Sequence, residues 1–282
     1  MKSAITTLAV LVACAAWGDA LAAEPVQAIS DLKGASVVAL SVLPHSPENG
    51  KLDDYCEGYR EKKLSDTGRL VANAGWIVTS EARLGSYDVV TFVSGFDPGT
   101  SGLCFARNAN VGIFKGSSLV ALAYTFPASD RKFGIVEPLE SGDLLVWGDE
   151  GIGAPVGELH TDDRGLRLTH IAPERTFCNF KAVVPNIYGK PLDAARAILI
   201  AHGWQPVRPK EQPGELDNAN TLAKRGVIEA ESCSGTGVGY CAFNYKGSAG
   251  ILGVTTVGGE PKPADNTVVQ YDVACSGHQS HH

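Results

Sequence analysis

The sequence predicts an α+β fold that is mainly β: a β-rich N-terminal domain, built as an antiparallel sandwich or an open barrel, and a smaller C-terminal α+β domain with one main helix on a short sheet. Short runs rich in Val, Leu and aromatic residues alternate with Gly, Pro, Asp and Ser through the first part of the chain, which is typical of successive antiparallel strands. A single helix pattern dominates the second part, within residues 184–204. We expect the β-rich domain over residues 23–176 and the α+β domain over residues 177–277.

The start of the sequence has the pattern of a secretory signal peptide. A basic Met-Lys pair precedes an almost wholly apolar run at residues 5–17, and small residues follow it. This run is shorter than the roughly 20 residues that a membrane-spanning helix needs. We therefore predict a signal peptide over residues 1–22 and a periplasmic or secreted protein. The tetrapeptide Leu-Val-Ala-Cys that ends at Cys14 also resembles a bacterial lipobox, so a lipoprotein anchored through Cys14 is the alternative.

The charge of the chain argues against some partners. The formal net charge is −7, and removal of the signal peptide deletes one cation and one anion, which leaves 23 − 30 = −7. An acidic protein without a basic run repels phosphate backbones and anionic lipid surfaces, so we predict no nucleic-acid partner. No later segment is long and apolar enough for a transmembrane span. About 260 mature residues are sufficient for a sizeable core.

The first domain is expected to contain a series of short strands and one helix. The expected strands lie at residues 36–43, 76–80, 87–93, 111–114, 119–126, 133–136, 144–147 and 166–171. The helix is expected from about residue 53 to residue 74, where Gly75 would end it before Trp76. Residues 172–176, which contain Pro173 and charged side chains, would link the two domains.

In the second domain, the signals within residues 184–204 all agree on one local structure. Pro185 favours an extended conformation before it, and Pro191 suits the first position of a helix, where no N–H bond is lost. Apolar residues then recur at steps of three and four, and Gly203 is placed to end the helix. A polar excursion at residues 210–220 is expected to be an exposed loop. Later strands are expected near residues 226–231, 240–245, 251–257 and 267–273.

This run resembles the opening half of a PASTA domain. The family pattern is matched by Val184, Pro185, Gly189, Ala195, Leu199 and Gly203, with Trp204 where the family usually has Leu. The resemblance implies a small extracytoplasmic module with one helix on a short sheet, of a kind associated with cell-wall peptides and β-lactams. The cysteine-rich segment that follows departs from the family pattern, which puts the inherited ligand in doubt. A generic extended-turn-helix-strand unit would show the same signals.

The cysteines predict a disulfide framework. Of seven cysteines, Cys14 lies in the signal peptide, and an even set of six remains, as expected for three disulfides in an exported chain. No C-x-x-C pair and no zinc-finger spacing occurs, which argues against a metal cluster or a redox site. The expected pairs bracket the second domain, flank a Gly-rich turn, and lie within the first domain: Cys178–Cys275, Cys233–Cys241 and Cys56–Cys104.

No catalytic, cofactor or metal site emerges from the sequence. A G-x-S-x-G nucleophile motif is absent, and the run from Gly235 to Gly239 lacks the Lys-Ser/Thr ending of a phosphate-binding loop. The remaining candidate residues are expected to lie in solvated turns, on strands, or on a mobile tail at residues 278–282 that is native or derived from a tag. They are His45, Ser101, Asp143, Asp149, Glu150, His160, Asp162, Asp163, His170, Ser234, His278, His281 and His282.

The sequence therefore favours a non-enzymatic binding protein of the bacterial envelope, which recognises a cell-wall fragment or a protein. Tyr188, Trp204 and Tyr240 are the expected contact aromatics, although the position of Trp204 favours the core. One alternative is a periplasmic inhibitor or immunity protein that plugs a lytic or toxic enzyme with the loop between Cys233 and Cys241. The other is a hydrolase with an unrecognised site, which would require a buried acid and a histidine to meet in one cleft.

Overall fold

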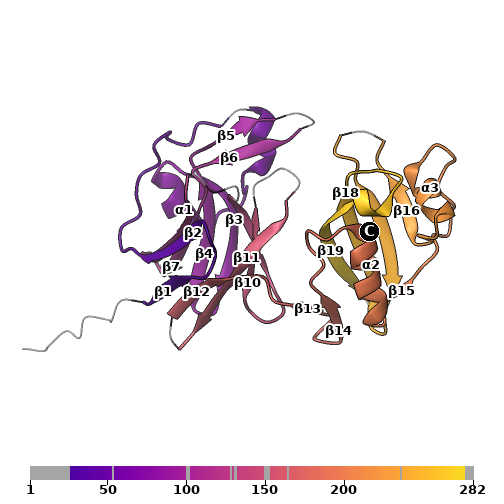
Figure 1. Cartoon of the computed structure of the whole chain (residues 1–282). Helices are drawn as coiled ribbons and strands as arrows, with labels where there is room; N and C mark the ends of the chain where they lie inside the picture. The colour runs from indigo at the N-terminus through magenta and orange to yellow at the C-terminus, as the bar shows by residue number, and fades with distance from the viewer. Residues whose placement is uncertain are drawn as a thin grey trace, which may run out of the picture.

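The computed structural model describes residues 26–52, 54–99, 102–127, 129, 132–148, 153–163, 165–235 and 237–276. The predicted signal peptide (residues 1–22), Cys14 and the predicted tail (residues 278–282) lie outside these ranges. Strands predominate, as expected. Figure 1 shows them in two bodies that lie side by side, which we also call the first and the second domain. Of the helices within the described ranges, none has the length and apolar character needed to cross a membrane.

The first body contains two five-stranded sheets and a separate two-stranded ribbon. Its elements are β1 (Ala28–Ser30), β2 (Ala35–Ala39), the 3-10 helix η1 (Asp54–Tyr59), α1 (Asp66–Asn73), β3 (Ile77–Leu84), β4 (Tyr87–Val93), β5 (Gly95–Pro98), β6 (Cys104–Arg107), β7 (Asn110–Lys115), β8 (Ser118–Thr125), β9 (Phe133–Pro138), β10 (Leu144–Gly148), β11 (Pro155–Asp162) and β12 (Gly165–Thr169). The sheets have the orders β1-β12-β11-β10-β9 and β2-β8-β7-β4-β3, and β5 pairs with β6. All their pairings are antiparallel except β1 with β12.

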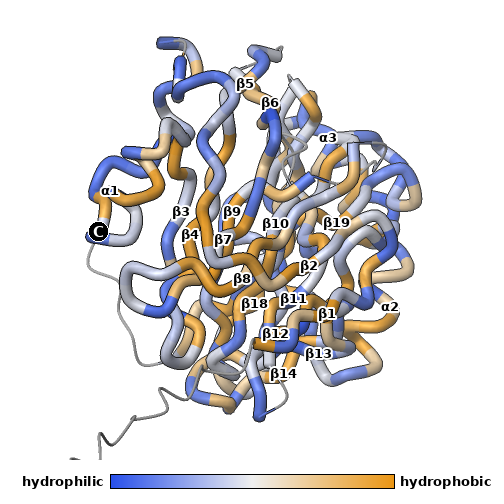
Figure 2. The backbone as a smooth tube through the Cα atoms, turned by 90° about the vertical axis from the view of Figure 1, so that its left-hand side faces the viewer, coloured by the Kyte–Doolittle hydropathy of each residue, from blue (hydrophilic) through white to orange (hydrophobic). Residues whose placement is uncertain are grey.

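A hydrophobic core fills the space between the two sheets. Strand β4 illustrates how it forms, because successive side chains of a strand point to opposite faces. Val89 and Val93 belong to the core between the sheets, whereas Val90 and Phe92 pack on the other face with Val71 of α1. The second sheet is thus covered on both faces, which explains the nearly continuous apolar run of β4. Figure 2 shows β4, β7 and β8 largely in the hydrophobic colour.

The edges of the two sheets meet on both sides of the sandwich, where β1 lies beside β2 and β3 beside β9. A β-bulge between Val78 and Ser80 shapes the second junction. The Thr79 hydroxyl donates to the carbonyl of Gly134 (2.8 Å), and the N–H of Val136 donates to the Ser80 hydroxyl (2.9 Å). Side chains of β3 therefore satisfy backbone groups of the β9 edge.

The prediction of a single helix over residues 53–74 is wrong. The structure has the 3-10 helix η1 and the separate eight-residue helix α1 in its place. Ser65 starts the new helix as its N-cap, because its hydroxyl accepts the N–H of Gly68 at 3.0 Å. The expected end of the helix is confirmed, since Gly75 has the left-handed φ of 83° just before Trp76.

The second body is smaller and contains a sheet, two α-helices and a hairpin. Its elements are β13 (Glu174–Phe177), β14 (Ala182–Pro185), α2 (Leu192–Ala201), β15 (Gln205–Pro206), α3 (Asn218–Lys224), β16 (Ala230–Cys233), β17 (Cys241–Lys246), β18 (Gly250–Val257), the 3-10 helix η2 (Pro263–Asp265) and β19 (Thr267–Cys275). The sheet has the order β15-β17-β18-β19, and β16 also pairs with β17. Leu192, Ala195 and Leu199 bury one face of α2 in the same core as the sheet.

Helix α2 confirms the predicted main helix, and Gly203 follows it with a φ of 85°. The loop expected at residues 210–220 is wrong in its last part, because helix α3 begins inside it. Asp217 caps its N-terminus by accepting the N–H of Ala219 at 2.8 Å. The expected strand at residues 226–231 is displaced, since β16 begins at Ala230.

Candidate functional site

The structure contains three disulfides with the predicted pairing, Cys56–Cys104, Cys178–Cys275 and Cys233–Cys241. Two of them close segments of 48 and 97 residues, and the third closes a segment of 8 residues. The first attaches an outlying ribbon to the β-rich body. The second joins the β13–β14 hairpin to the last strand of the second sheet.

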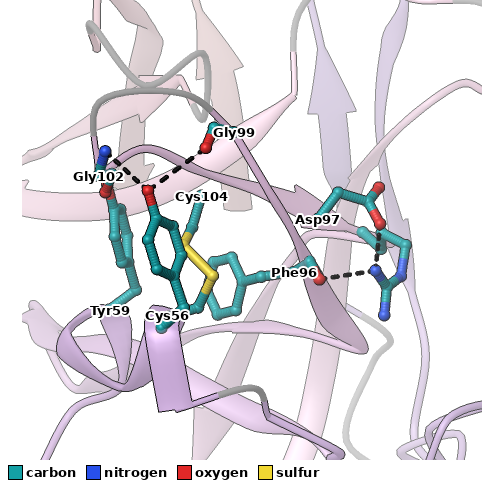
Figure 3. Close-up of a disulfide and its surroundings, with 9 residues drawn as sticks. Cys56, Tyr59, Phe96, Asp97, Gly99, Gly102 and Cys104 are labelled. Atoms are coloured by element: carbon teal, nitrogen blue, oxygen red, sulfur yellow. Dashed lines mark hydrogen bonds and ion pairs between the residues drawn. A yellow bond between two sulfur atoms is a disulfide. The ribbon is translucent and has the colours of Figure 1, made fainter.

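The ribbon formed by β5 and β6 lies outside the two large sheets and is covalently fixed to η1. Figure 1 places it at the top of that domain, above the two large sheets. A two-stranded hairpin is only marginally stable by itself. Here Cys56 of η1 and Cys104 of β6, both fully buried, join the ribbon to the 3-10 helix beneath it (Figure 3).

Two tyrosines of η1 hold the far end of the ribbon. The N–H of Gly102 donates to the Tyr55 hydroxyl at 2.8 Å, and that hydroxyl donates to the carbonyl of Gly99 at 3.3 Å. The Tyr59 hydroxyl donates to the carbonyl of Gly102 at 3.3 Å. Figure 3 shows Gly99 and Gly102 joined by dashed lines to a tyrosine hydroxyl of the helix, with Tyr59 beside it. Through these hydrogen bonds, the residue after β5 and the residues before β6 are both attached to η1.

An ion-pair network fixes the base of the ribbon. Arg107 of β6 pairs with Glu48 and with Asp97 of β5, and it donates to the carbonyl of Phe96 at 2.7 Å. The Ser94 hydroxyl also donates to Glu48, at 2.7 Å. The hydrogen bonds from Arg107 and Ser94 lower the pKa of Glu48 below its usual range, so this carboxylate stays ionised. The base is thus fixed by charge-assisted hydrogen bonds.

Three aromatic side chains, two on η1 and one on the ribbon, remain exposed where these linked elements meet, and we call them the aromatic ribbon surface. Tyr55 is 50% exposed, Tyr59 38% and Phe105 37%. The Tyr59 ring packs 5.5 Å from the buried ring of Phe96, which limits its rotation. Aromatic rings that are held before binding offer contact area with little further loss of conformational entropy. The arrangement is suited to contact with a partner.

The predicted contact aromatics do not form one surface. Trp204 is only 4% exposed and donates its ring N–H to the carbonyl of Val183 at 3.1 Å, so its inclusion in a contact surface was wrong. Tyr188 is half-buried between the two bodies, 5.8 Å from the ring of Trp147 and 4.3 Å from that of Tyr271. Tyr240, at 40% exposed, remains available for contact on another part of the second domain.

Tyr240 belongs to the hairpin that Cys233 and Cys241 close. Gly237 and Gly239 adopt φ values of 69° and 66°, which most other residues adopt only with strain. The carbonyl of Tyr240 accepts the N–H of Ser234 at 2.6 Å. Gly237 and Gly239 therefore lie in the connection between the paired strands β16 and β17, where glycines were expected to permit a turn.

The two bodies meet around a buried arginine, Arg175 of β13. Its guanidinium donates to the Tyr188 hydroxyl at 2.5 Å and to Glu137 of β9 at 3.1 Å. It also lies over two rings, 4.9 Å from the centre of Phe177 and 5.6 Å from that of Tyr271. Burial raises the pKa values of Tyr188 and Tyr271, so both phenols stay neutral. Arg175 thus connects the first body to the second.

A left-handed turn strengthens this junction. Cys178, Asn179 and Phe180 follow β13 with φ values of 62°, 57° and 61°, a conformation that costs free energy for residues with a Cβ. Glu140 of the first body accepts the N–H groups of Asn179 (2.8 Å) and Phe180 (3.0 Å) with its two oxygens. The segment expected to be a simple link is therefore part of a hairpin that contacts both bodies.

Beside the junction, the structure brings together an acid and an imidazole that the sequence did not connect. Asp143 Oδ1 lies 3.0 Å from His160 Nδ1, and the other ring nitrogen lies 2.9 Å from the Thr169 hydroxyl and 3.5 Å from Glu158. Glu158 is only 3% exposed, and it accepts the N–H of Ala172 at 3.0 Å. His160, Glu158 and Asp143 line a cleft of about 280 Å³ together with Arg175. We call this group the histidine cleft.

The histidine cleft was missed because strand β11 was missed. Pro155 and Gly157 argue against a strand, yet proline is tolerated at a strand's first residue. A Cβ at Gly157 would lie 2.6 Å from Leu32, so glycine is needed there for close packing. Once β11 is recognised, the two-residue spacing of Glu158 and His160 places both side chains on one face.

The other candidate residues gather at no common site in the described part of the chain. His45, His170, Asp162, Asp163 and Ser234 are exposed and lie in separate loops or at strand ends, whereas Ser101, Asp149, Glu150 and the histidines at 278, 281 and 282 lie outside the described residues. Across the described ranges, no group of three or more His, Cys, Asp or Glu residues is placed to hold a metal ion.

Comparison with protein-family models, curated proteins and solved structures found no match to this chain. The resemblance of residues 184–204 to a PASTA domain therefore stays a prediction.

Proposed function

We propose that this chain is an exported, non-enzymatic interaction protein of the bacterial envelope, and that the aromatic ribbon surface contacts its partner, an envelope protein or a cell-wall fragment. The observation that carries the proposal is the exposure of Tyr55 and Tyr59 on η1 and of Phe105 on the ribbon, two elements that the Cys56–Cys104 disulfide joins. Tyrosine is among the residues that contribute most to binding energy, and buried aromatic anchors are typical of interface centres. The three disulfides support export into an oxidising compartment.

The shape of the ribbon also bears on the kind of partner. A narrow, fixed projection fits a concave surface on another protein, which is compatible with the inhibitor alternative. In that version the ribbon, and not the Cys233–Cys241 hairpin, would enter the cleft of the partner enzyme. Its rigidity before binding would lower the entropic cost of the complex.

The variant Phe105→Ala should weaken partner binding about tenfold or more, because a central aromatic anchor contributes at least ~1.4 kcal/mol. Binding is measured by affinity capture from envelope extract and by co-sedimentation with purified peptidoglycan at low salt. Ile251→Ala is the matched control, since Ile251 is also 37% exposed but lies on the second domain. Equal retention by the two variants, or no retention by the wild-type chain in either assay, would rule out the ribbon as the contact surface.

A second candidate function is hydrolysis at the histidine cleft. It is favoured by the 3.0 Å contact between Asp143 and His160, an arrangement in which a carboxylate orients a histidine that acts as a general base. The cleft is small for a substrate pocket, for which volumes of about 300–1,000 Å³ are usual. The Thr169 hydroxyl is also engaged, because it donates to the carbonyl of His170 at 3.0 Å. For these reasons we place this function second.

If the cleft is catalytic, His160→Gln should lower the turnover of a chromogenic ester or peptide substrate about 100-fold or more, as expected for loss of a general base. His202→Gln, which changes an exposed histidine of the second domain, should leave the rate unchanged. The wild-type chain is assayed first against a broad substrate panel. No turnover of any substrate, or the same rate in His160→Gln as in the wild type, would remove the hydrolase candidate.

A further inference from the structure

A cavity of about 590 Å³ opens at one end of the β sandwich, and its lining shares no residue with the aromatic ribbon surface or with the histidine cleft. Residues from both sheets line it, because the ends of β2 and β8 meet the ends of β9, β11 and β12 there. The volume lies within the range of about 300–1,000 Å³ that is typical of small-ligand sites. The mouths of β-barrels are common positions for such sites, and this cavity is similarly placed because the edges of the two sheets meet on both sides of the sandwich.

The inside of the cavity is apolar. Phe133 is 1% exposed, Val156 7% and Leu32 8%, and all three side chains line it. Phe126, at 47% exposed, lies at its opening, where its N–H donates to the carbonyl of Gly34 at 2.8 Å. Burial of an apolar ligand body against these side chains would be favourable in proportion to the area removed from water.

Two nitrogen-bearing side chains also line the cavity, Lys33 and His170. Both are exposed, and neither side chain has a hydrogen-bond or ion-pair partner among the residues that the structure describes. The nearby Asp31 is engaged elsewhere, because it pairs with Arg167 at 3.1 Å. The opening therefore carries a positive charge that no described carboxylate neutralises, on a chain whose net charge is −7.

We propose that this cavity binds a small amphiphilic acid, with its apolar body between the two sheets and its carboxylate at Lys33 and His170. The apolar lining favours an apolar ligand chain, and the unpaired cation favours a negatively charged head group. This site is independent of the proposed interaction function, since the aromatic ribbon surface contributes no residue to it.

The proposal is tested by calorimetric titration of the full mature chain with decanoate and with decanol, which share the same apolar chain and differ in charge. We expect decanoate to bind at one site and more tightly than decanol. Val156→Trp should weaken both ligands about tenfold or more by filling the cavity. The control Val42→Trp adds the same side chain at a position that is 71% exposed and should change neither affinity.

The double variant Lys33→Ala/His170→Ala should weaken decanoate about fivefold and leave decanol unchanged, because it removes the charge and spares the cavity. A measurement on the wild-type chain guards against a misfolded variant: decanoate should shift the NMR signals of the His170 ring and leave those of His202, an exposed histidine of the second domain, in place. No decanoate binding at millimolar concentration, equal affinity for decanol, or unchanged His170 signals at saturation would overturn the proposal.

Discussion

Replacement of Cys178 and Cys275 by serine is expected to lower the free energy of unfolding by about 4–5 kcal/mol, the largest effect that we anticipate. The disulfide closes a segment of 97 residues, which spans nearly the whole second domain. The cross-link removes conformational entropy from the unfolded chain, and this entropy grows with the length of the closed segment. Without it, the β13–β14 hairpin loses its covalent link to β19.

The short disulfide provides the matched control. Cys233 and Cys241 close a segment of 8 residues, for which the same entropy model gives only about 2–3 kcal/mol. Urea unfolding of the two double-serine variants, followed by far-UV circular dichroism, measures the difference. If both variants lose the same stability, the dependence on segment length fails, and the contribution of the long disulfide must come from local packing at the hairpin.

The pairing of these cysteines could be predicted from the sequence because it depended on position along the chain. Cys178 and Cys275 lie at the two ends of the second domain, and Cys233 and Cys241 lie on either side of a glycine-rich turn. Helix α2 could be predicted for a similar reason, since Pro191 and Gly203 mark both of its ends locally. Helix α2 could be predicted from a few neighbouring residues, whereas the disulfide pairing could be predicted from the place of each cysteine relative to a domain end or a turn.

The errors arose where a local signal was overridden or overlooked. The pattern of residues 53–74 suggested one helix, but Cys56 is linked to a ribbon strand 48 residues further along the chain. Ser65, which starts α1, and Asp217, which starts α3, are both typical N-cap residues, so these two helix starts were present in the sequence. At residues 210–220, Pro213 and Gly214 favoured a loop, although Asp217 within this segment begins α3.

Contacts between distant segments could not be predicted. Asp143 precedes β10 and His160 lies on β11, and the register that pairs Leu144 with Leu159 brings them together. Strand register is set by the packing of whole sheets and cannot be obtained from a single strand. The same holds for the cavity at the end of the sandwich, whose residues come from five strands or their adjoining loops.

The junction between the two bodies gives the second large expected effect. Arg175→Met should lower the free energy of unfolding by about 2–4 kcal/mol, because it leaves the Tyr188 hydroxyl without its donor and removes the contacts of the guanidinium with two rings. The effect should be no greater than the middle of the ~3–5 kcal/mol range of a fully buried ion pair, since Glu137 is 43% exposed and water can solvate it. Arg175→Lys keeps the charge but lacks the planar guanidinium group with its several N–H donors. Its free energy of unfolding should therefore fall by an intermediate amount.

Arg175 also connects Glu137 of the first body to Tyr188 of the second, so its removal should loosen their relative orientation as well as lower stability. Small-angle X-ray scattering of Arg175→Met should give a broader distance distribution than that of the wild-type chain. Arg69→Met is the control, because Arg69 forms an exposed ion pair with Asp66, and its loss should cost less than about 1 kcal/mol. If Arg175→Met resembles this control in both urea unfolding and scattering, the buried arginine does not hold the two bodies together, and the left-handed turn held by Glu140 would have to do so.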